Sequence, residues 1–420
     1  MNPVIAVVSV RSAPATAGIS LHFEFPPTGE TVDLPLPGRG PLEAVRRKAG
    51  YYLSRLVPLV AETPVTGASV GEALRLLLNS GRELASLLAG GDRRRMLRLQ
   101  EAFQVAWPTW EVADWDDPVA PVPVVQVNCA TETFPLELLP LFGFGRMADA
   151  GNDLDLARAA ARLLGFSCVV QRLTVNALPD DHVLRNEPAL PVQFLRHRGL
   201  GSVGEEERFL GSLHPHVSVE GPWPEAQDDD AVRHGLLRAL FDGAALSLPP
   251  GDGLPPVQVQ HFACHCDTSA EHDDDYTIVL STRRGRRRSV TFGELRQWYH
   301  DAYFEDPRDA RNRAVIILNA CASSRTDPVT ASSFPRWFLE WGHRAFIGTE
   351  TDVPDDVAAA FAACLYGRLL ERRRPLGEAV VRARRDLLRD YRSPLGILYV
   401  MYGDADLTVE RSRPGVHRAG

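Results

Sequence analysis

The sequence has few of the residues that mark specialised classes of protein. Lys48 is the only lysine among 46 basic residues, and we attribute this bias towards arginine to GC-rich coding. The 46 basic residues do not exceed the 54 acidic ones, and the formal net charge is −8. A large nucleic-acid footprint requires a basic surface, so this charge balance argues against nucleic acid as a direct partner.

Cysteine is scarce as well. Six cysteines in 420 residues are too few and too scattered to stabilise a fold of this size through disulfides. We therefore predict reduced thiols and a cytoplasmic location. Because cysteine is among the residue types most often buried, we assign Cys129, Cys168 and Cys364 to packing.

Long apolar runs and internal repeats are also missing. The first ten residues, MNPVIAVVSV, lack the charged region that begins a signal peptide. No stretch approaches the ~18 apolar residues that a membrane span requires, so we expect no membrane partner. The absence of any repeat at a fixed period excludes solenoids and propellers.

What is present is the composition of a folded globular protein, with 45% hydrophobic and 24% charged residues. From residue 116 onward, short apolar runs alternate with helical segments, and several runs are apolar on both faces, as buried parallel strands are. This alternation predicts an α/β layered sandwich with a mostly parallel central sheet flanked by helices. Capping-box pairs predict three helix starts, at Ser69 with Glu72, Ser202 with Glu205, and Thr291 with Glu294.

Two predicted strands end at reactive side chains. The run VQVQHFAC from Val257 meets His265, and the run AVIILNA from Ala314 meets Cys321. Ligands bind outside the carboxyl ends of parallel strands, so His265 and Cys321 face one crevice if the two strands are neighbours. An imidazole beside a thiol can generate the attacking thiolate and later protonate the leaving amine. The separation of 56 positions is close to the ~50 between the histidine and cysteine of caspases.

These motifs resemble a known family. HFACH (His261–His265) and IILNAC (Ile316–Cys321) look like the histidine and cysteine motifs of the CHAT family, caspase-like cysteine peptidases related to separases. FPLELLPL (Phe134–Leu141) is similar to the family's P-x-E-x-L segment, and the chain from RAFIGT onward resembles its last strand and paired helices. The four segments occur in the expected order over roughly residues 70–410.

The resemblance implies a caspase-like three-layer fold in which Cys321 is the nucleophile and His265 the general base and acid. It also implies that the backbone N–H groups of Cys321 and Cys266 hold the oxyanion. The family usually has glycine where this chain has Cys266, and a side chain there costs on the order of 1 kcal/mol or more if the position needs a positive φ. The predicted regions are short strands in 1–45, a helical region in 46–115, a non-catalytic half in 116–250, a catalytic half in 251–410, and a flexible tail in 411–420.

Several side chains near these strand ends are candidates for the pocket that holds the P1 side chain. The acidic loop HDDDY after the histidine strand would suit a basic side chain, although a solvated turn is the simpler interpretation. Two acidic residues follow RAFIGT, where caspase-like folds shape this pocket, and an asparagine two positions before the cysteine would reach its floor. The candidates are Asp273, Asp275, Glu350, Asp352 and Asn319.

Two other patterns have a competing interpretation. His261, Cys264, His265, Cys266 and His272 fall within twelve positions, which raises a zinc site, but no second ligand pair exists and adjacent strand residues face opposite ways. We therefore expect no metal and no organic cofactor. The run RRGRRR (Arg283–Arg288) is most simply a hairpin tip, with a self-processing site as the alternative.

The sequence thus predicts a cysteine endopeptidase that cleaves a protein or peptide substrate in a regulated bacterial pathway of the immune or cell-death type. The helical region before residue 116 could relay activation by a protein partner. Two alternatives stay open: a catalytically inactive scaffold with the same fold, and a regulatory metal-binding module.

Overall fold

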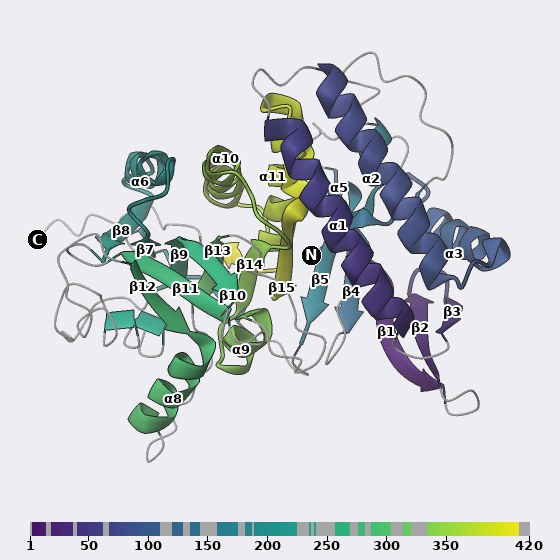
Figure 1. Cartoon of the computed structure of the whole chain (residues 1–420), viewed down its shortest axis with the longest axis horizontal. Coiled ribbons are helices and arrows are strands. Elements are labelled where there is room, and N and C mark those ends of the chain that lie inside the picture. The colour runs from purple at the N-terminus through teal and green to yellow at the C-terminus, as the bar shows by residue number, and fades with distance from the viewer. Residues whose placement is uncertain are drawn as a thin grey trace, which may run out of the picture.

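The structure is a computed structural model of the chain (Figure 1). The residues that it describes are 2–13, 18–36, 40–61, 67–109, 120–128, 135–142, 158–174, 181–186, 189–224, 235–236, 239–240, 257–268, 276–281, 287–303, 314–320 and 334–410.

A sheet of 11 strands runs through the molecule in the order β3-β2-β1-β4-β5-β15-β14-β13-β9-β7-β8. The pairings β1–β2, β2–β3 and β14–β15 are antiparallel and the other seven are parallel, which confirms the predicted mostly parallel sheet. The strands are β1 (Val4–Ala13), β2 (Gly18–Phe25), β3 (Glu30–Leu36), β4 (Val124–Asn128), β5 (Val169–Leu173), β7 (Leu190–Arg196), β8 (Val217–Trp223), β9 (Val259–Ala263), β13 (Val315–Asn319), β14 (Ala345–Thr349) and β15 (Tyr399–Gly403).

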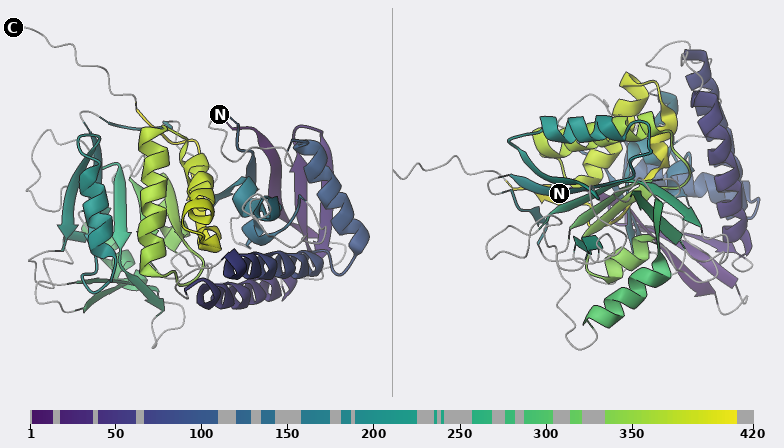
Figure 2. Two further views of the ribbon diagram at one scale, coloured as in Figure 1. Left: turned by 90° about the horizontal axis from the view of Figure 1, so that it is seen from above. Right: turned by 60° about the vertical axis from the view of Figure 1, so that its left-hand side comes forward.

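Helices cover both faces of this sheet. One apolar cluster joins the sheet to α6, α10 and α11, and another joins its opposite face to α8 and α9 (Figure 2, right). Every residue of β9, β13 and β14 is therefore buried, which is why β13 and β14 are largely apolar in sequence, whereas β9 also buries Gln260 and His261. The helices are α6 (Val203–Ser212), α8 (Phe292–Tyr303), α9 (Phe334–Glu340), α10 (Asp355–Tyr366) and α11 (Leu376–Asp390).

The N-terminal strands belong to the same sheet, because β1 pairs in parallel with β4. Three helices pack against this end of the sheet and share one apolar cluster with it. Figure 2 shows α1 and α2 side by side. These helices are α1 (Gly40–Ala61), α2 (Gly67–Leu88) and α3 (Arg93–Ala106). The predicted strands and helices of this region are therefore present, whereas the division of the chain into the five predicted regions stays a prediction.

None of the helices within the described ranges is long and apolar enough to cross a bilayer.

Short elements complete the fold. The remaining elements are η2 (Leu136–Leu138), α5 (Leu164–Ser167), η4 (Gly367–Glu371) and η5 (Pro394–Leu398), a three-stranded sheet of β10 (His265–Thr268), β11 (Tyr276–Ser281) and β12 (Arg287–Thr291), and the pair β6 (Val183–Leu184) and β16 (Thr408–Val409).

The β11–β12 pair bears on the predicted hairpin at RRGRRR. The pairing of Ser281 with Arg287 confirms a hairpin between the two strands, while residues 282–286 lie outside the described residues. Arg287 and Arg288 belong to β12 itself. The self-processing alternative stays a prediction.

One of the three predicted capping boxes forms. The N–H of Thr291 donates to the Glu294 carboxylate at 2.8 Å, and the N–H of Glu294 donates to Thr291 Oγ1 at 3.0 Å. Ser202 does precede α6, but its side chain accepts no capping hydrogen bond, so that box is wrong. The helix start predicted at Ser69 is wrong, because α2 already begins at Gly67.

Candidate active site

Three neighbouring parallel strands end at the same edge of the sheet. Ala263, the last residue of β9, lies opposite Arg196 at the end of β7 and opposite Asn319 at the end of β13. The chain after each strand therefore emerges at one place, the position where α/β sheets bind ligands.

His265 lies at this edge. The chain bends at Cys264 and continues as β10, whose first residue is His265, opposite Val279 of β11. The imidazole is half-buried and lines a pocket together with Ala320, the residue that follows β13. The predicted nucleophile Cys321 lies outside the described residues, directly after Ala320 in the sequence.

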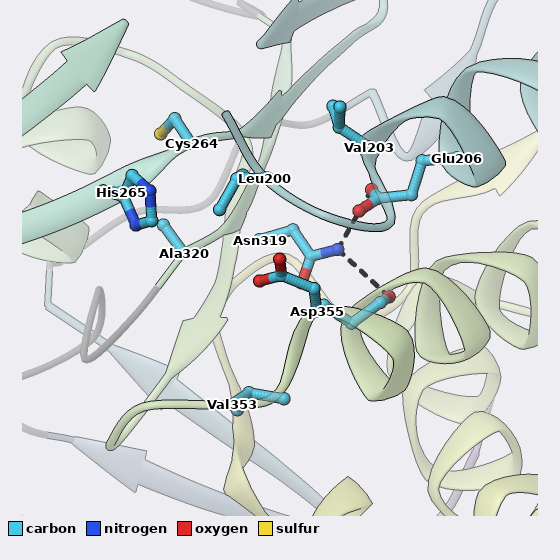
Figure 3. A pocket seen from close by; sticks show the side chains of 10 residues that line it. Leu200, Val203, Glu206, Cys264, His265, Asn319, Ala320, Val353 and Asp355 are labelled. Atoms are coloured by element: carbon cyan, nitrogen blue, oxygen red, sulfur yellow. Dashed lines mark hydrogen bonds between the residues drawn. The ribbon is translucent and has the colours of Figure 1, made fainter. Parts of the chain in front are cut away.

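The pocket is small, opens to solvent, and lies between α6, α10 and the ends of β9 and β13 (Figure 3). Apolar side chains form most of its wall, and two carboxylates and one amide supply polar groups. The lining residues are Leu200, Val203, Glu206, Cys264, His265, Asn319, Ala320, Val353, Asp355 and Ala358.

Asn319 lines this pocket and is held on three sides, while its assignment to the floor of the P1 pocket stays a prediction. Its Nδ2 donates to Glu206 Oε2 and to the carbonyl of Ala358, both at 3.0 Å, and its Oδ1 accepts from the Tyr399 hydroxyl at 2.6 Å. The amide is buried. Asn319 therefore fixes the end of β13, immediately before the residues that carry the predicted nucleophile.

Glu206 is a site residue that our sequence interpretation missed. It lies on α6 with only 4% of its surface exposed, and His261 Nε2 donates to its Oε2 at 2.6 Å. The Tyr366 hydroxyl lies 3.3 Å from the other ring nitrogen of His261. The signal that could have found Glu206 is its spacing from Val203 and Leu210, the two buried apolar residues of the same helix.

Asp355 is the second missed carboxylate. It is the first residue of α10, and its Oδ2 accepts a hydrogen bond from the N–H of Gly201 at 2.7 Å. This contact links the loop before α6 to the start of α10 across the pocket. Acidic residues are common in the first turn of a helix, so the sequence offered no reason to assign Asp355 to the site.

Of the other acidic candidates, Glu350 and Asp352 are not among the described residues that line this pocket. The Asp352 side chain is exposed, and the charge of Glu350 acts on Arg172. Burial alone would lower the pKa of Arg172, but the carboxylates of Glu137 and, more weakly, Glu350 raise it. Asp273 and Asp275 lie outside the described residues. Their assignment to the P1 pocket stays a prediction.

Cys266 does not adopt the strained backbone that its position could have required. It lies in β10 opposite Ile278, and Arg373 and Arg392 are the non-glycine residues with positive φ in the described part of the chain. The cost that we associated with a side chain after the histidine therefore does not arise.

The remaining cysteines agree with a packing role where they are described. Burial raises the pKa of Cys168, and burial is also the main reason that the pKa of Cys364 rises to about 12. Cys129 lies outside the described residues. A thiol with a raised pKa carries little thiolate at neutral pH and is a poor nucleophile.

The residues of the zinc alternative do not converge where they can be seen. His261 contacts Glu206 and Tyr366 on one face of β9, whereas Cys264 belongs to the apolar cluster on the other face. Among the residues whose positions are given, no three His, Cys, Asp or Glu side chains form a group that could hold a metal ion. His272 lies outside them.

The molecule is thus an α/β protein with a histidine and a small pocket at the ends of adjacent parallel strands. The profile of the CHAT domain matches residues 200–410, just over half of the chain. The chain belongs to the CHAT domain family, which confirms the resemblance found in its motifs.

Among curated proteins, a probable protease of Vitiosangium sp. (strain GDMCC 1.1324) is 30% identical over 101 residues. The aligned segment is 24% of this chain and 13% of that relative, so the chain spans a small part of its length.

Two solved structures are similar at low sequence identity. Separase of Saccharomyces cerevisiae, in complex with securin, is 12% identical with a TM-score of 0.44, and the match covers 96% of this chain and 30% of that one. The Arg-specific cysteine proteinase gingipain R of Porphyromonas gingivalis is 10% identical with a TM-score of 0.40, and the match covers 83% of this chain and 70% of that one.

Proposed function

We propose that this protein is a cysteine endopeptidase in which Cys321 is the nucleophile and His265 the general base and acid. The observation that carries the proposal is that His265 and Ala320 line one pocket at the ends of adjacent parallel strands, with Cys321 next in the chain. A thiol and an imidazole at such an edge are the groups that acyl transfer requires.

The reaction has two halves. His265 takes the proton of the Cys321 thiol, and the thiolate attacks the peptide carbonyl carbon to give a tetrahedral oxyanion. Collapse breaks the C–N bond, the amine leaves with the proton from His265, and a thioester remains. His265 then takes a proton from water as the water oxygen attacks the thioester; the second tetrahedral adduct collapses with cleavage of the C–S bond, His265 returns the proton to the Cys321 sulfur, and the acid is released. The backbone N–H groups of Cys266 and Cys321 are our candidates to stabilise both oxyanions.

We further propose that the pocket accepts a basic P1 side chain. Lysine and arginine combine an aliphatic stem with a cationic end. Leu200, Val203 and Val353 supply an apolar wall for the stem, and Glu206 and Asp355 supply two carboxylates for the cation. Asp355 accepts from the neutral N–H of Gly201, and Glu206 Oε2 accepts from the neutral amide of Asn319 and from His261, so we propose that these two carboxylates attract the cationic end of the substrate side chain.

The experiment is the digestion of a proteome-derived peptide library by the wild type, Cys321→Ala and His265→Ala. We expect new peptide ends after arginine or lysine with the wild type and none with either variant. Cleavage by Cys321→Ala at the wild-type rate would contradict the mechanism, and cleavage without a basic preference would contradict the P1 assignment. Equal labelling of the wild type and Cys321→Ala by a thiol-directed probe would favour an inactive scaffold.

Membership of the CHAT family supports a dedicated protein substrate and a regulated bacterial pathway. Our proposal includes an activating protein partner. The proposal therefore predicts that the purified chain gains activity when lysate from its own cells is added.

A further inference from the structure

The proposed mechanism leaves one residue beside the dyad unused. His197 follows β7, and its backbone N–H donates to the carbonyl of Ala263, the last residue of β9, at 2.7 Å. The N–H of the next residue, Arg198, donates to Ser281 Oγ of β11 at 2.7 Å. The same two elements hold His265, which lies two residues after Ala263 and in the strand that pairs with β11. His197 and His265 are therefore fixed to one scaffold.

The two imidazoles are in direct contact. Their ring centroids are 4.9 Å apart and their planes meet at 63°, an edge-to-face arrangement. Aromatic rings attract one another in this geometry, and the preferred orientation restricts rotation of the ring. His197 is buried, whereas His265 is half-buried and faces the pocket. The buried ring is thus the support and the half-buried ring is the one that can react.

A second contact fixes the His197 ring itself. The N–H of Gly199 donates to His197 Nδ1 at 3.1 Å. A ring nitrogen that accepts a hydrogen bond carries no proton, so the bonded imidazole is uncharged. An uncharged neighbour does not repel the imidazolium that forms when His265 takes the thiol proton.

Glycine at position 199 makes this contact possible. A Cβ atom there would lie 2.9 Å from Cε1 and 3.2 Å from Nδ1 of His197. These distances are shorter than ordinary van der Waals contacts, so a side chain at this position would push the imidazole of His197 out of place.

We infer that His197 is a positioning residue that sets the orientation of the His265 imidazole towards the nucleophile. The inference rests on the proposed function, since it assigns His197 a part in the same reaction. His197 touches neither the substrate nor the reacting atoms in this account. Its ring holds His265, and Gly199 holds its ring.

The test compares His197→Ala with His197→Phe, which keeps a ring against His265 but cannot accept from Gly199. We expect His197→Ala to lower kcat about tenfold to hundredfold, with KM unchanged, because a small misplacement of a catalytic group has effects of this size. His197→Phe should recover most of the rate. Gly199→Ala should change kcat in the same direction as His197→Ala.

The rate of Cys321 alkylation by iodoacetamide, without substrate, is the second readout. It should fall in His197→Ala in proportion to kcat, and thermal melting should establish that each variant is folded. A wild-type kcat in His197→Ala, or a His197→Phe variant as slow as His197→Ala, would overturn the inference. Wild-type alkylation that does not depend on His265 would instead contradict the proposed function.

Discussion

Glu137 and Glu206 are both buried glutamates, and they are held in different ways. Glu137, in η2, receives two hydrogen bonds of 2.5 Å from the guanidinium of Arg172, and Arg384 lies 3.7 Å away. Glu206, on α6, receives hydrogen bonds from His261 and from the amide of Asn319. Both side chains are at most 4% exposed.

The partners decide what each carboxylate can do. Burial alone would raise the pKa of Glu137, but the Arg172 cation more than offsets this and holds the pKa below its usual range. Its charge is compensated within the core, so the P-x-E-x-L motif that contains it is a structural anchor. Glu206 lines a pocket, and its partners are the neutral amide of Asn319 and the imidazole of His261. A buried carboxylate in that position is suited to a ligand with positive charge.

The largest expected effect comes from breaking the first site. Glu137→Gln leaves the buried Arg172 without its carboxylate, and removal of one partner of a buried ion pair costs about 3–5 kcal/mol. We expect this loss in the free energy of unfolding measured with urea. Glu206→Gln is the matched control and should lose less, about 1–3 kcal/mol, because glutamine keeps an oxygen that can accept from His261 or Asn319. Equal losses in the two variants would remove the distinction between the sites.

The second prediction concerns activity instead of stability, and it applies to the carboxylates that line the pocket. Glu206→Gln and Asp355→Asn should each lower kcat/KM on a peptide with arginine at P1 by about tenfold to hundredfold, the range for a hydrogen bond to a charged group. A matched peptide with a neutral P1 residue should be affected little. If both peptides lose activity equally, the carboxylates do not determine specificity.

A similar contrast exists at the starts of two helices, where one side chain makes a capping hydrogen bond and the other does not. Thr291→Ala removes a cap that forms at α8 and should lower the free energy of unfolding by about 1 kcal/mol. Ser202→Ala, at the start of α6, removes a side chain that makes no capping hydrogen bond and should have almost no effect. Urea unfolding of both variants checks this, and a larger loss in Ser202→Ala would contradict the structure of that cap.

A third buried carboxylate, Asp404, has a partner at the surface and gives the smallest effect. His182 Nδ1 lies 2.7 Å from Asp404 Oδ2, and this hydrogen bond raises the pKa of His182. A raised histidine pKa contributes stability that is complete below its ordinary value of about 6.5 and is lost as the pH rises through the folded value. The His182 side chain is 39% exposed, so solvent limits the contribution to roughly 1 kcal/mol or less.

Unfolding of the wild type and His182→Asn at a series of pH values measures this term. The stability advantage of the wild type should shrink as the pH rises above the ordinary histidine value of about 6.5. An advantage that grows with pH over this interval would show that the sign is wrong.

Local patterns predicted the elements where one residue type dominates a segment. AVIILN and RAFIGT are buried strands, as their composition indicated, because helices cover both faces of the sheet. The predicted helix start at Ser69 failed because α2 begins two residues earlier, and a capping box indicates only a local preference.

The polar groups of the site were harder to predict, because they come together only in the folded chain. Glu206 lies between two other glutamates, and nothing local separates it from them except its helical spacing from Val203 and Leu210. His197 ends the run PVQFLRH in the way that His265 follows its own strand, so the rule that selected His265 applied to it as well.

Local sequence patterns could not predict which arginine side chains are buried. Arg384 lies in the polar-looking run VVRARRDLL, yet its guanidinium is 1% exposed. It donates to the carbonyl of Gly165 at 2.6 Å and to that of Tyr399. Gly165 is 219 positions away in the chain, so only the tertiary structure shows that Arg384 has a buried partner.

The most direct test of the account is to alkylate the nucleophile with a peptidyl acyloxymethyl ketone that has arginine at P1, which forms a thioether with the thiolate and releases a carboxylate, and to map the adduct by mass spectrometry. The account predicts one adduct, on Cys321, that forms far more slowly in His265→Ala. An adduct on Cys264 or Cys266 in place of Cys321, or a rate that is unchanged in His265→Ala, would contradict it.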